Sequence, residues 1–206
     1  MMKQKKVLYQ LALALSLPIV SPLKLNVTAI SARDGSSTLE CWQLDNPFDT
    51  SSQPGTSGTA AAMLSSVSNL SYAIIPSGFD GGVHHAPYTQ WVVFTSGFAY
   101  ITLPADEDTS AVVSGGQFGL ILAADTIDVS REGHRTQYPG ITETVALQIP
   151  TCDGKVPPHG VLHMGPCIAN EVAGVREFAM AEGTQLDQVG REAEGRADNL
   201  LPFHLR

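Results

Sequence analysis

The sequence predicts an all-β fold in a single domain, on three observations. Glycine and proline are frequent, with 19 and 13 residues in a chain of 206. Short runs of β-branched and aromatic residues alternate with turn-forming residues, which is typical of antiparallel sheets. Long segments with helical periodicity are missing before residue 168. Together these features favour a barrel or sandwich built from strands alone.

Residues 1–20 are typical of a secretory signal peptide. Three lysines precede the apolar run Val7–Val20, which is too short for a comfortable membrane span. A buried N-terminal helix is the alternative. Cleavage after residue 20 would change the formal net charge from −8 to −11, because this segment holds three lysines and no acid. Such an acidic surface argues against nucleic acids and anionic membranes as partners.

Sequons and cysteines fit a secretory or extracellular location. Asn26 and Asn69 each begin an N-glycosylation motif. An oxidising compartment favours one disulfide among the three cysteines and leaves one thiol free. We expect the bond between Cys41 and Cys167, because it would tie an early strand to the end of the barrel. Cys152 remains an alternative partner for either of them.

We expect about eight strands in the barrel, which is assigned to residues 21–167 between the signal peptide and the tail. The segments with strand character, in chain order, are 25–31, 37–44, 67–75, 91–94, 98–103, 111–113, 117–124, 141–150 and 161–164. The segment 141–150 alternates most clearly, with Val145, Leu147 and Ile149 on one face and Thr144, Ala146 and Gln148 on the other. Polar loops are expected at 46–58, 104–110 and 125–140. Residues 168–206 predict a weak helix or a mobile tail.

The stretch from Gly78 to Gly97 holds the most chemistry. Two adjacent histidines, His84 and His85, follow a glycine-rich turn, and Gln90 opens an apolar run that ends before Gly97. We expect this run and segment 98–103 to form a β-hairpin that turns at Gly97. His85 and Gln90 would then lie at the mouth of a pocket.

The candidate site residues are imidazole, amide, phenol, indole and guanidinium groups. The predicted catalytic residues are His85, Gln90 and His134, and the predicted substrate-binding residues are His84, Trp91, Arg135 and Tyr138. Each histidine has a structural alternative as a hydrogen-bonded residue at a loop, and Trp91 has one as a core residue. No nucleophile elbow, phosphate loop or dinucleotide fingerprint occurs in the sequence.

The spacing of these residues resembles the first motif of the cupins. His85, Gln90 and Gly97 match the second histidine, the glutamate and the final glycine of that motif, whereas Val83 stands where its first histidine would be. The resemblance implies a cupin-like jelly-roll barrel. It also implies a divalent metal as an alternative to the cofactor-free site that we expect, held by His85, Gln90 and His134.

Further stretches resemble a group of small secreted cupin-like proteins of filamentous fungi. These stretches are 39–44, 116–120, 133–140, 143–150 and 161–167. The resemblance implies a hetero-Diels–Alderase that needs no cofactor and joins a polyketide-derived tropolone to a humulene-type sesquiterpene. A metal-dependent cupin oxygenase or isomerase and a non-catalytic secreted binding protein are the alternatives.

Overall fold

The computed structural model describes residues 23–172, and its architecture confirms the all-β prediction. The predicted signal peptide and residues 173–206 of the predicted tail lie outside the described residues. The strands and the single helical turn are β1 Lys24–Arg33, β2 Ser36–Pro47, β3 Asp49–Thr50, β4 Ala60–Ala61, β5 Ser71–Ile75, β6 Asp80–His84, β7 Gln90–Ser96, β8 Phe98–Leu103, β9 Asp106–Ser114, β10 Leu120–Ala123, β11 His134–Gln137, β12 Thr144–Pro150, β13 His159–Met164 and α1 Ala169–Val172.

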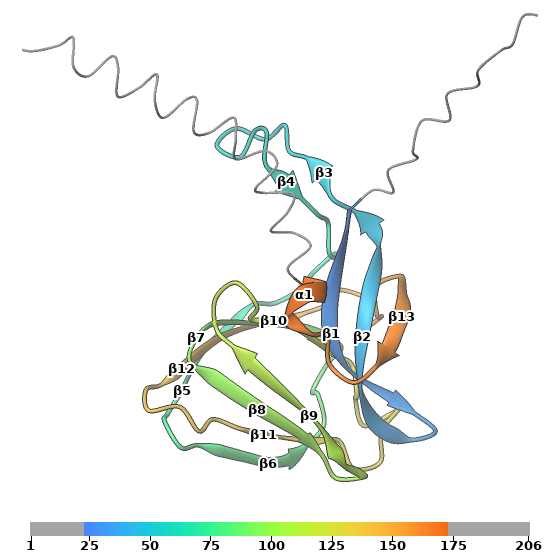
Figure 1. Ribbon diagram of the computed structural model, residues 1–206, viewed down its shortest axis with the longest axis vertical. Coiled ribbons are helices and arrows are strands. Elements are labelled where there is room, and N and C mark those ends of the chain that lie inside the picture. Colours follow the sequence, from blue (N-terminus) through green and yellow to red (C-terminus); the bar gives the residue numbers. More distant parts are fainter. Residues whose placement is uncertain (1–22, 173–206) are drawn as a thin grey trace, which may run out of the picture.

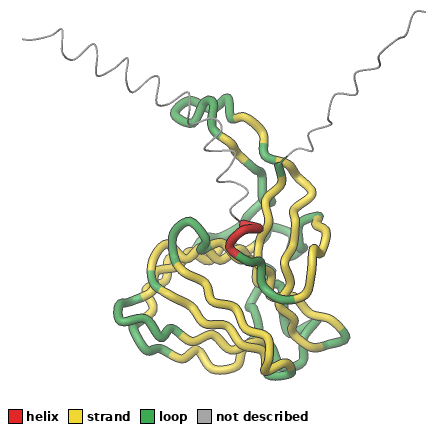
Figure 2. Tube along the Cα trace, in the orientation of Figure 1, coloured by secondary structure: helices red, strands yellow, loops and turns green. Residues whose placement is uncertain are grey.

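The strands form two principal sheets (Figures 1 and 2). The larger is a seven-stranded mixed sheet in the order β13-β2-β1-β10-β7-β12-β5, in which only β1 and β10 run parallel. The smaller is an antiparallel sheet in the order β6-β11-β8-β9. Strands β3 and β4 form a separate two-stranded ribbon. None of the helices among residues 23–172 is long and apolar enough to span a membrane.

The main hydrophobic core lies between the two sheets. Leu39, Phe94 and Ile121 of the larger sheet pack in one cluster with Ile101 and Val113 of the smaller sheet, and all five are buried. Alternation along each strand explains this arrangement, because every second side chain faces the opposing sheet. The facing layers therefore enclose an interior that side chains of both sheets line.

A second core covers the outer face of the larger sheet. Trp42 and Trp91 are almost completely buried in this cluster, and Leu64 from the segment between β4 and β5 packs against it. The Trp91 indole N–H donates a hydrogen bond of 2.9 Å to Ser65 in the same segment. The larger sheet therefore packs apolar residues on both faces, the inner face in the main core and the outer face in this second cluster.

The predicted hairpin at Gly97 is wrong. Strand β7 pairs with β10 and β12, whereas β8 pairs with β9 and β11, so Gly97 carries the chain from one sheet to the other. Its φ of 82° is unfavourable for residues with a side chain, and a Cβ at this position would lie 2.3 Å from the Thr144 hydroxyl oxygen. Glycine is therefore required here for a crossover and not for a hairpin turn.

Strands β6 and β11 occupy segments that the sequence predicts to be a turn and a loop. β11 lies between β6 and β8 and pairs with both, and Arg135 has a partner on each side. Glycine and charged residues have low strand propensity, so hydrogen bonding within the sheet decides the conformation of these segments. The segment 104–110 likewise contains the start of β9.

Two finer predictions are confirmed. The structure contains the Cys41–Cys167 disulfide and leaves Cys152 as a free, exposed thiol. In β12, Thr144 and Ala146 are buried toward the interior, where Gln148 also lies. Val145, Leu147 and Ile149 are half-buried on the other face.

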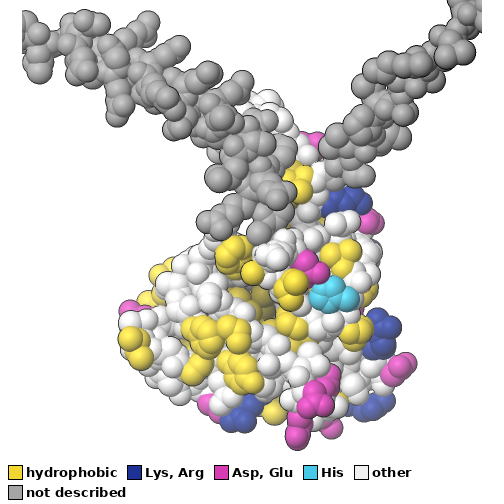
Figure 3. Space-filling view, in the orientation of Figure 1, with side chains coloured by type: hydrophobic (Ala, Val, Ile, Leu, Met, Phe, Trp, Pro, Cys, Tyr) yellow, Lys and Arg dark blue, Asp and Glu magenta, His cyan; other side chains and the backbone are white. Residues whose placement is uncertain are grey.

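Figure 3 shows one face of the molecule, on which charged side chains lie mostly at the lower and right margins.

Candidate functional site

A cavity of about 350 Å³ lies between the two sheets. Much of its wall is aliphatic or aromatic, including Ile30, Val92, Phe94, Ile101 and Ile121. Its polar lining comes from His84, His85, Gln90, His134, Thr136, Tyr138 and Gln148. A volume of this size with a few convergent polar groups is typical of small-molecule sites.

A larger outer chamber of about 900 Å³ adjoins this inner cavity. The two share His85, Ala86, Pro87, Gln90 and Gln148, so the loop between β6 and β7 forms the boundary between them. Three large exposed side chains, Leu70, Tyr88 and Ile127, line the outer chamber, and Asp128 is the only charged residue among the described residues of its wall. The approach to the inner cavity is therefore almost uncharged and combines these apolar side chains with neutral polar groups such as Asn69 and Thr89.

The centre of the inner cavity's polar end is a buried pair, His134 and Asp125. The distance between His134 Nδ1 and Asp125 Oδ2 is 2.7 Å, and the exposed fractions of the two residues are 4% and 0%. The same Asp125 oxygen accepts a hydrogen bond of 2.7 Å from the Ser37 hydroxyl. Asp125 Oδ1 has no hydrogen-bond partner within residues 23–172.

The hydrogen bonds around this pair have one consistent direction. Ser37 uses its only proton on Asp125, so Ser130, at an Oγ–Oγ distance of 2.7 Å, donates to Ser37. The Gly133 N–H in turn donates to the Ser130 hydroxyl oxygen over 3.0 Å. These hydrogen bonds lead from Gly133 through Ser130 and Ser37 to the Asp125 carboxylate, which only accepts. The Nδ1 atom of His134 therefore carries the proton that it donates to Asp125.

This arrangement leaves Nε2 of neutral His134 with a lone pair. Nε2 has no hydrogen-bond partner in the described part of the chain, and His134 lines the inner cavity. A carboxylate that fixes the tautomer and orientation of an imidazole is the usual support of a general base. His134 can therefore accept a proton from a molecule in the cavity and return it.

The adjacent residues His84 and His85 have different neighbours. His84, the last residue of β6, is paired in register with His134, and the centroids of their rings are 4.6 Å apart. His85 Nε2 lies 3.0 Å from the Ser130 carbonyl oxygen, which can only accept, so this nitrogen carries a proton and is occupied. Val83, at the position of the first cupin histidine, is 56% exposed.

Gln90 is another buried polar residue that faces the ligand space. It is 4% exposed and lines both the inner cavity and the outer chamber. No hydrogen bond of its side chain occurs with any residue from 23 to 172. Asp125 Oδ1 is the one fully buried side-chain polar atom without a partner within residues 23–172, so the Gln90 amide is open to the cavity and can bind a polar atom of a ligand there.

Three predicted substrate-binding residues lie in different surroundings. Trp91 belongs to the outer cluster described above and does not line either chamber. Arg135 is exposed and pairs with Asp80 outside the cavity, with its Nε 3.1 Å from Asp80 Oδ1. The hydrogen bond from Arg135 lowers the pKa of Asp80 to about 2. Tyr138 does line the inner cavity, and burial raises the pKa of its phenol, so it is a neutral donor there.

The predicted metal ligands do not form a fitting donor set. Gln90 offers only an amide, and no three His, Cys, Asp or Glu side chains among residues 23–172 converge in the inner cavity. The described residues contain one group of three such donors elsewhere, namely Cys41, His163 and Glu171.

The sequence does not predict the residues that support His134. Asp125 falls in the polar loop expected at 125–140, and neither it nor Ser37 and Ser130 is among the predicted site residues. The only local signal is that Asp125 lies two residues after the end of the buried strand β10, at the point where the chain enters a loop. A search of protein-family models and of curated protein sequences finds no match to this chain. The function is therefore argued from the site and from the residues that suggested the family resemblance.

Proposed function

We propose that the protein is a secreted, cofactor-independent hetero-Diels–Alderase that joins a quinone methide, derived from a tropolone or phenol, to a humulene-type sesquiterpene. The observation that supports this proposal is the buried His134–Asp125 pair at the polar end of an apolar cavity. The site offers proton transfer and an apolar surface, which are the two requirements of such a reaction.

The first step is loss of water from a hydroxymethyl tropolone or phenol. Nε2 of His134 takes the proton of the ring hydroxyl while the bond between carbon and oxygen of the hydroxymethyl group breaks. The same proton then goes to the departing oxygen, so one molecule of water leaves and His134 returns to its neutral form. The neutral phenol of Tyr138 and the amide of Gln90 donate hydrogen bonds to the ring oxygens as charge develops.

The second step is addition of an alkene to the quinone methide. No proton or electron is exchanged with the protein, so catalysis depends on holding both reactants in a reactive geometry. The inner cavity suits the ring and the outer chamber suits the hydrocarbon, since these chambers meet at Gln90 and His85. Exclusion of water by the apolar wall protects the reactive diene from hydration.

We also infer a jelly-roll barrel of the cupin type and a secretory location. Two facing sheets with a common core and a ligand cavity between them support the barrel. A disulfide supports an oxidising compartment. Of the two sequons, Asn69 is exposed on the wall of the outer chamber, whereas the Asn26 side chain is hydrogen-bonded to Gln43 and to the Glu171 carbonyl oxygen. We therefore expect a glycan at Asn69.

The test is product formation by His134→Gln, with His159→Gln as the matched control. His159 is an imidazole outside the cavity that stacks on Trp42. Purified protein is incubated with the hydroxymethyl tropolone and the sesquiterpene in the presence of a chelator. His134→Gln should lose about 10²-fold or more in rate, the usual contribution of one acid–base group, while the control keeps its rate and both keep their melting temperatures.

Two outcomes would reject the proposal. Adduct yield and stereochemistry equal to those without protein would remove the enzymatic activity. A wild-type rate for His134→Gln would remove the role of the buried pair. In the first case the exposed apolar wall of the outer chamber favours the second candidate, a non-catalytic binding protein for a neutral apolar molecule, which saturable binding without turnover would support.

A further inference from the structure

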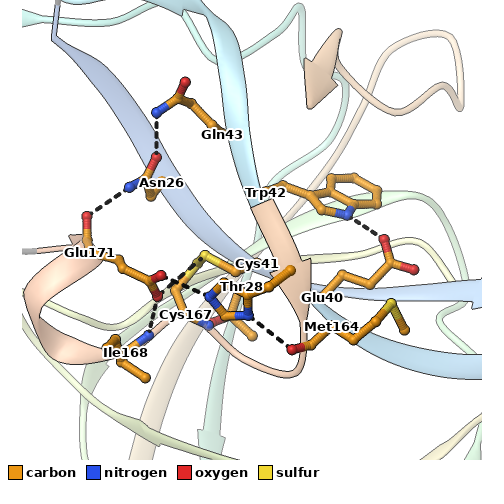
Figure 4. Close-up of a disulfide and its surroundings, with 11 residues drawn as sticks. Asn26, Thr28, Glu40, Cys41, Trp42, Gln43, Met164, Cys167, Ile168 and Glu171 are labelled. Carbon is orange, nitrogen blue, oxygen red and sulfur yellow. Dashed lines mark hydrogen bonds and ion pairs between the residues drawn. A yellow bond between two sulfur atoms is a disulfide. The ribbon is translucent and has the colours of Figure 1, made fainter. Parts of the chain in front are cut away.

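A second cluster of reactive side chains surrounds the disulfide, away from the inner cavity (Figure 4). Cys41 lies on β2, His163 on β13, Cys167 in the loop that follows β13, and Glu171 on α1. The donor atoms of Cys41, His163 and Glu171 all lie within 4.8 Å of one another. Cys167 shares this position because its sulfur is bonded to that of Cys41.

The imidazole of this cluster is already oriented as a metal ligand. Nδ1 of His163 lies 2.9 Å from the Met164 carbonyl oxygen, which only accepts, so Nδ1 donates and Nε2 faces Glu171 at 2.8 Å. Histidines that bind metals almost always donate the proton of the other ring nitrogen to a carbonyl or carboxylate in this way. At present a proton occupies the space between Nε2 and the Glu171 carboxylate.

The carboxylate of Glu171 is also held in place. Its Oε2 accepts a hydrogen bond of 2.7 Å from the backbone N–H of Ile168, and the same oxygen lies 3.7 Å from Cys41 Sγ. Two ligands of a tetrahedral zinc ion with bonds of about 2.3 Å to sulfur and about 2.1 Å to oxygen are separated by about 3.6 Å. The spacing between sulfur and carboxylate therefore already fits such an ion.

We propose that reduction of the Cys41–Cys167 disulfide creates a four-coordinate zinc site from Cys41, Cys167, His163 and Glu171. A dithiol reductant transfers two electrons to the disulfide, becomes a disulfide itself, and leaves two thiols on the protein. Zinc then displaces both thiol protons and the proton between His163 and Glu171. In the oxidised protein the sulfurs are not thiolates, so the site forms only after reduction.

Only small movements separate the disulfide-bonded protein from the reduced, zinc-bound protein. The sulfur atoms must move from a covalent bond to about 3.8 Å apart, the separation in a tetrahedral zinc site, by rotation of the two cysteine side chains. The Cα atoms of Cys41 and Cys167 are 4.6 Å apart. Cys41 is held in β2, and the backbone N–H of Cys167 donates a hydrogen bond of 3.0 Å to the Thr28 hydroxyl of β1. The metal would join the same two points of the chain that the disulfide joins, and would add α1 to the connection.

The test uses the full chain with Cys152→Ser, so that the cluster holds the only two thiols. After reduction with a phosphine, cobalt(II) is added and the charge-transfer absorption of cobalt–thiolate bonds is recorded, and zinc is then used to displace cobalt. We expect one equivalent of metal in the reduced protein and none in the oxidised protein. His163→Ala and Glu171→Gln should each weaken zinc binding by about 10-fold or more, and His159→Ala, on the same strand, should not.

Three outcomes would overturn the proposal. The first is less than about a tenth of an equivalent of cobalt bound by the reduced protein. The second is equal zinc affinity in the wild type and in Glu171→Gln, which would mean that two free thiols bind the metal without the cluster. The third is a reduced protein that loses its circular dichroism spectrum and does not regain it with zinc. Recovery of the spectrum on zinc addition, in contrast, would support the site.

Discussion

The disulfide should be a large contributor to the stability of this fold. It joins residues that are 126 apart in the sequence, so its loss releases most of the described chain from one closed loop. The loop-closure model gives an entropy loss in the unfolded state equivalent to about 5 kcal/mol at 25 °C for a loop of this length. For a chain of this size, each kcal/mol corresponds to about 2–4 °C in melting temperature. We therefore expect the double variant Cys41→Ser, Cys167→Ser to melt about 10–20 °C below the wild type.

The measurement is thermal and urea unfolding of the double variant and of the protein with an intact disulfide, and both proteins carry Cys152→Ser. This background prevents exchange between the free thiol and the disulfide, and its own stability is the control. A decrease in melting temperature of less than about 3 °C would refute the reasoning, because other contacts would then constrain the unfolded chain as strongly as the covalent bond does.

Three further predictions concern single residues. Gly97→Ala should lower the free energy of unfolding by at least about 2 kcal/mol, because the φ of Gly97 is positive and a Cβ there would clash with Thr144. The measurement is urea unfolding, and a decrease of less than about 0.5 kcal/mol would contradict the crossover geometry. Asp80 has a pKa lowered from 3.8 to about 2 by Arg135, so its ion pair stabilises the fold above about pH 4 and this contribution is lost as the pH falls through 2. The stability difference between wild type and Asp80→Asn should therefore shrink over that range, and a constant difference in urea midpoint would argue against the pair. Gln90→Leu should weaken the binding of a polar ligand in a titration, because it removes an amide that faces both the inner cavity and the outer chamber. An affinity equal to that of the wild type would show that the amide does not contact the ligand.

The sequence predicts those parts of the fold in which each residue's own preference agrees with the sheet. Strands rich in β-branched residues were located, and the faces of β12 were assigned correctly from alternation alone. Alternation along β7 also places Gln90, Val92 and Phe94 on one face, and all three line the inner cavity. The Cys41–Cys167 disulfide is expected from the sequence because it ties an early strand to the end of the barrel, but Cys152 is an alternative partner that only the structure removes.

The remaining features depend on contacts between distant segments. β6 and β11 have sequences that favour turns, and they become strands because each supplies hydrogen bonds to the other. The network of Ser37, Asp125 and His134 joins residues from three parts of the chain, and no local spacing announces it. Gly97 was predicted to form a turn, but the sequence does not indicate whether the chain returns to the same sheet or enters the other.

The parallel pairing of β1 and β10 has a consequence for the order in which the protein folds. β1 is made early in synthesis and can form a hairpin with β2, but its other edge pairs with β10, where Thr28 of β1 lies beside Ile121, far later in the chain. Until β10 emerges, this edge presents unpaired N–H and C=O groups and the apolar side chains of the future core. Such nonlocal pairing slows folding and exposes the nascent chain to association with other strands. We therefore expect the half-synthesised chain to depend on chaperones that cover this edge until the second half arrives.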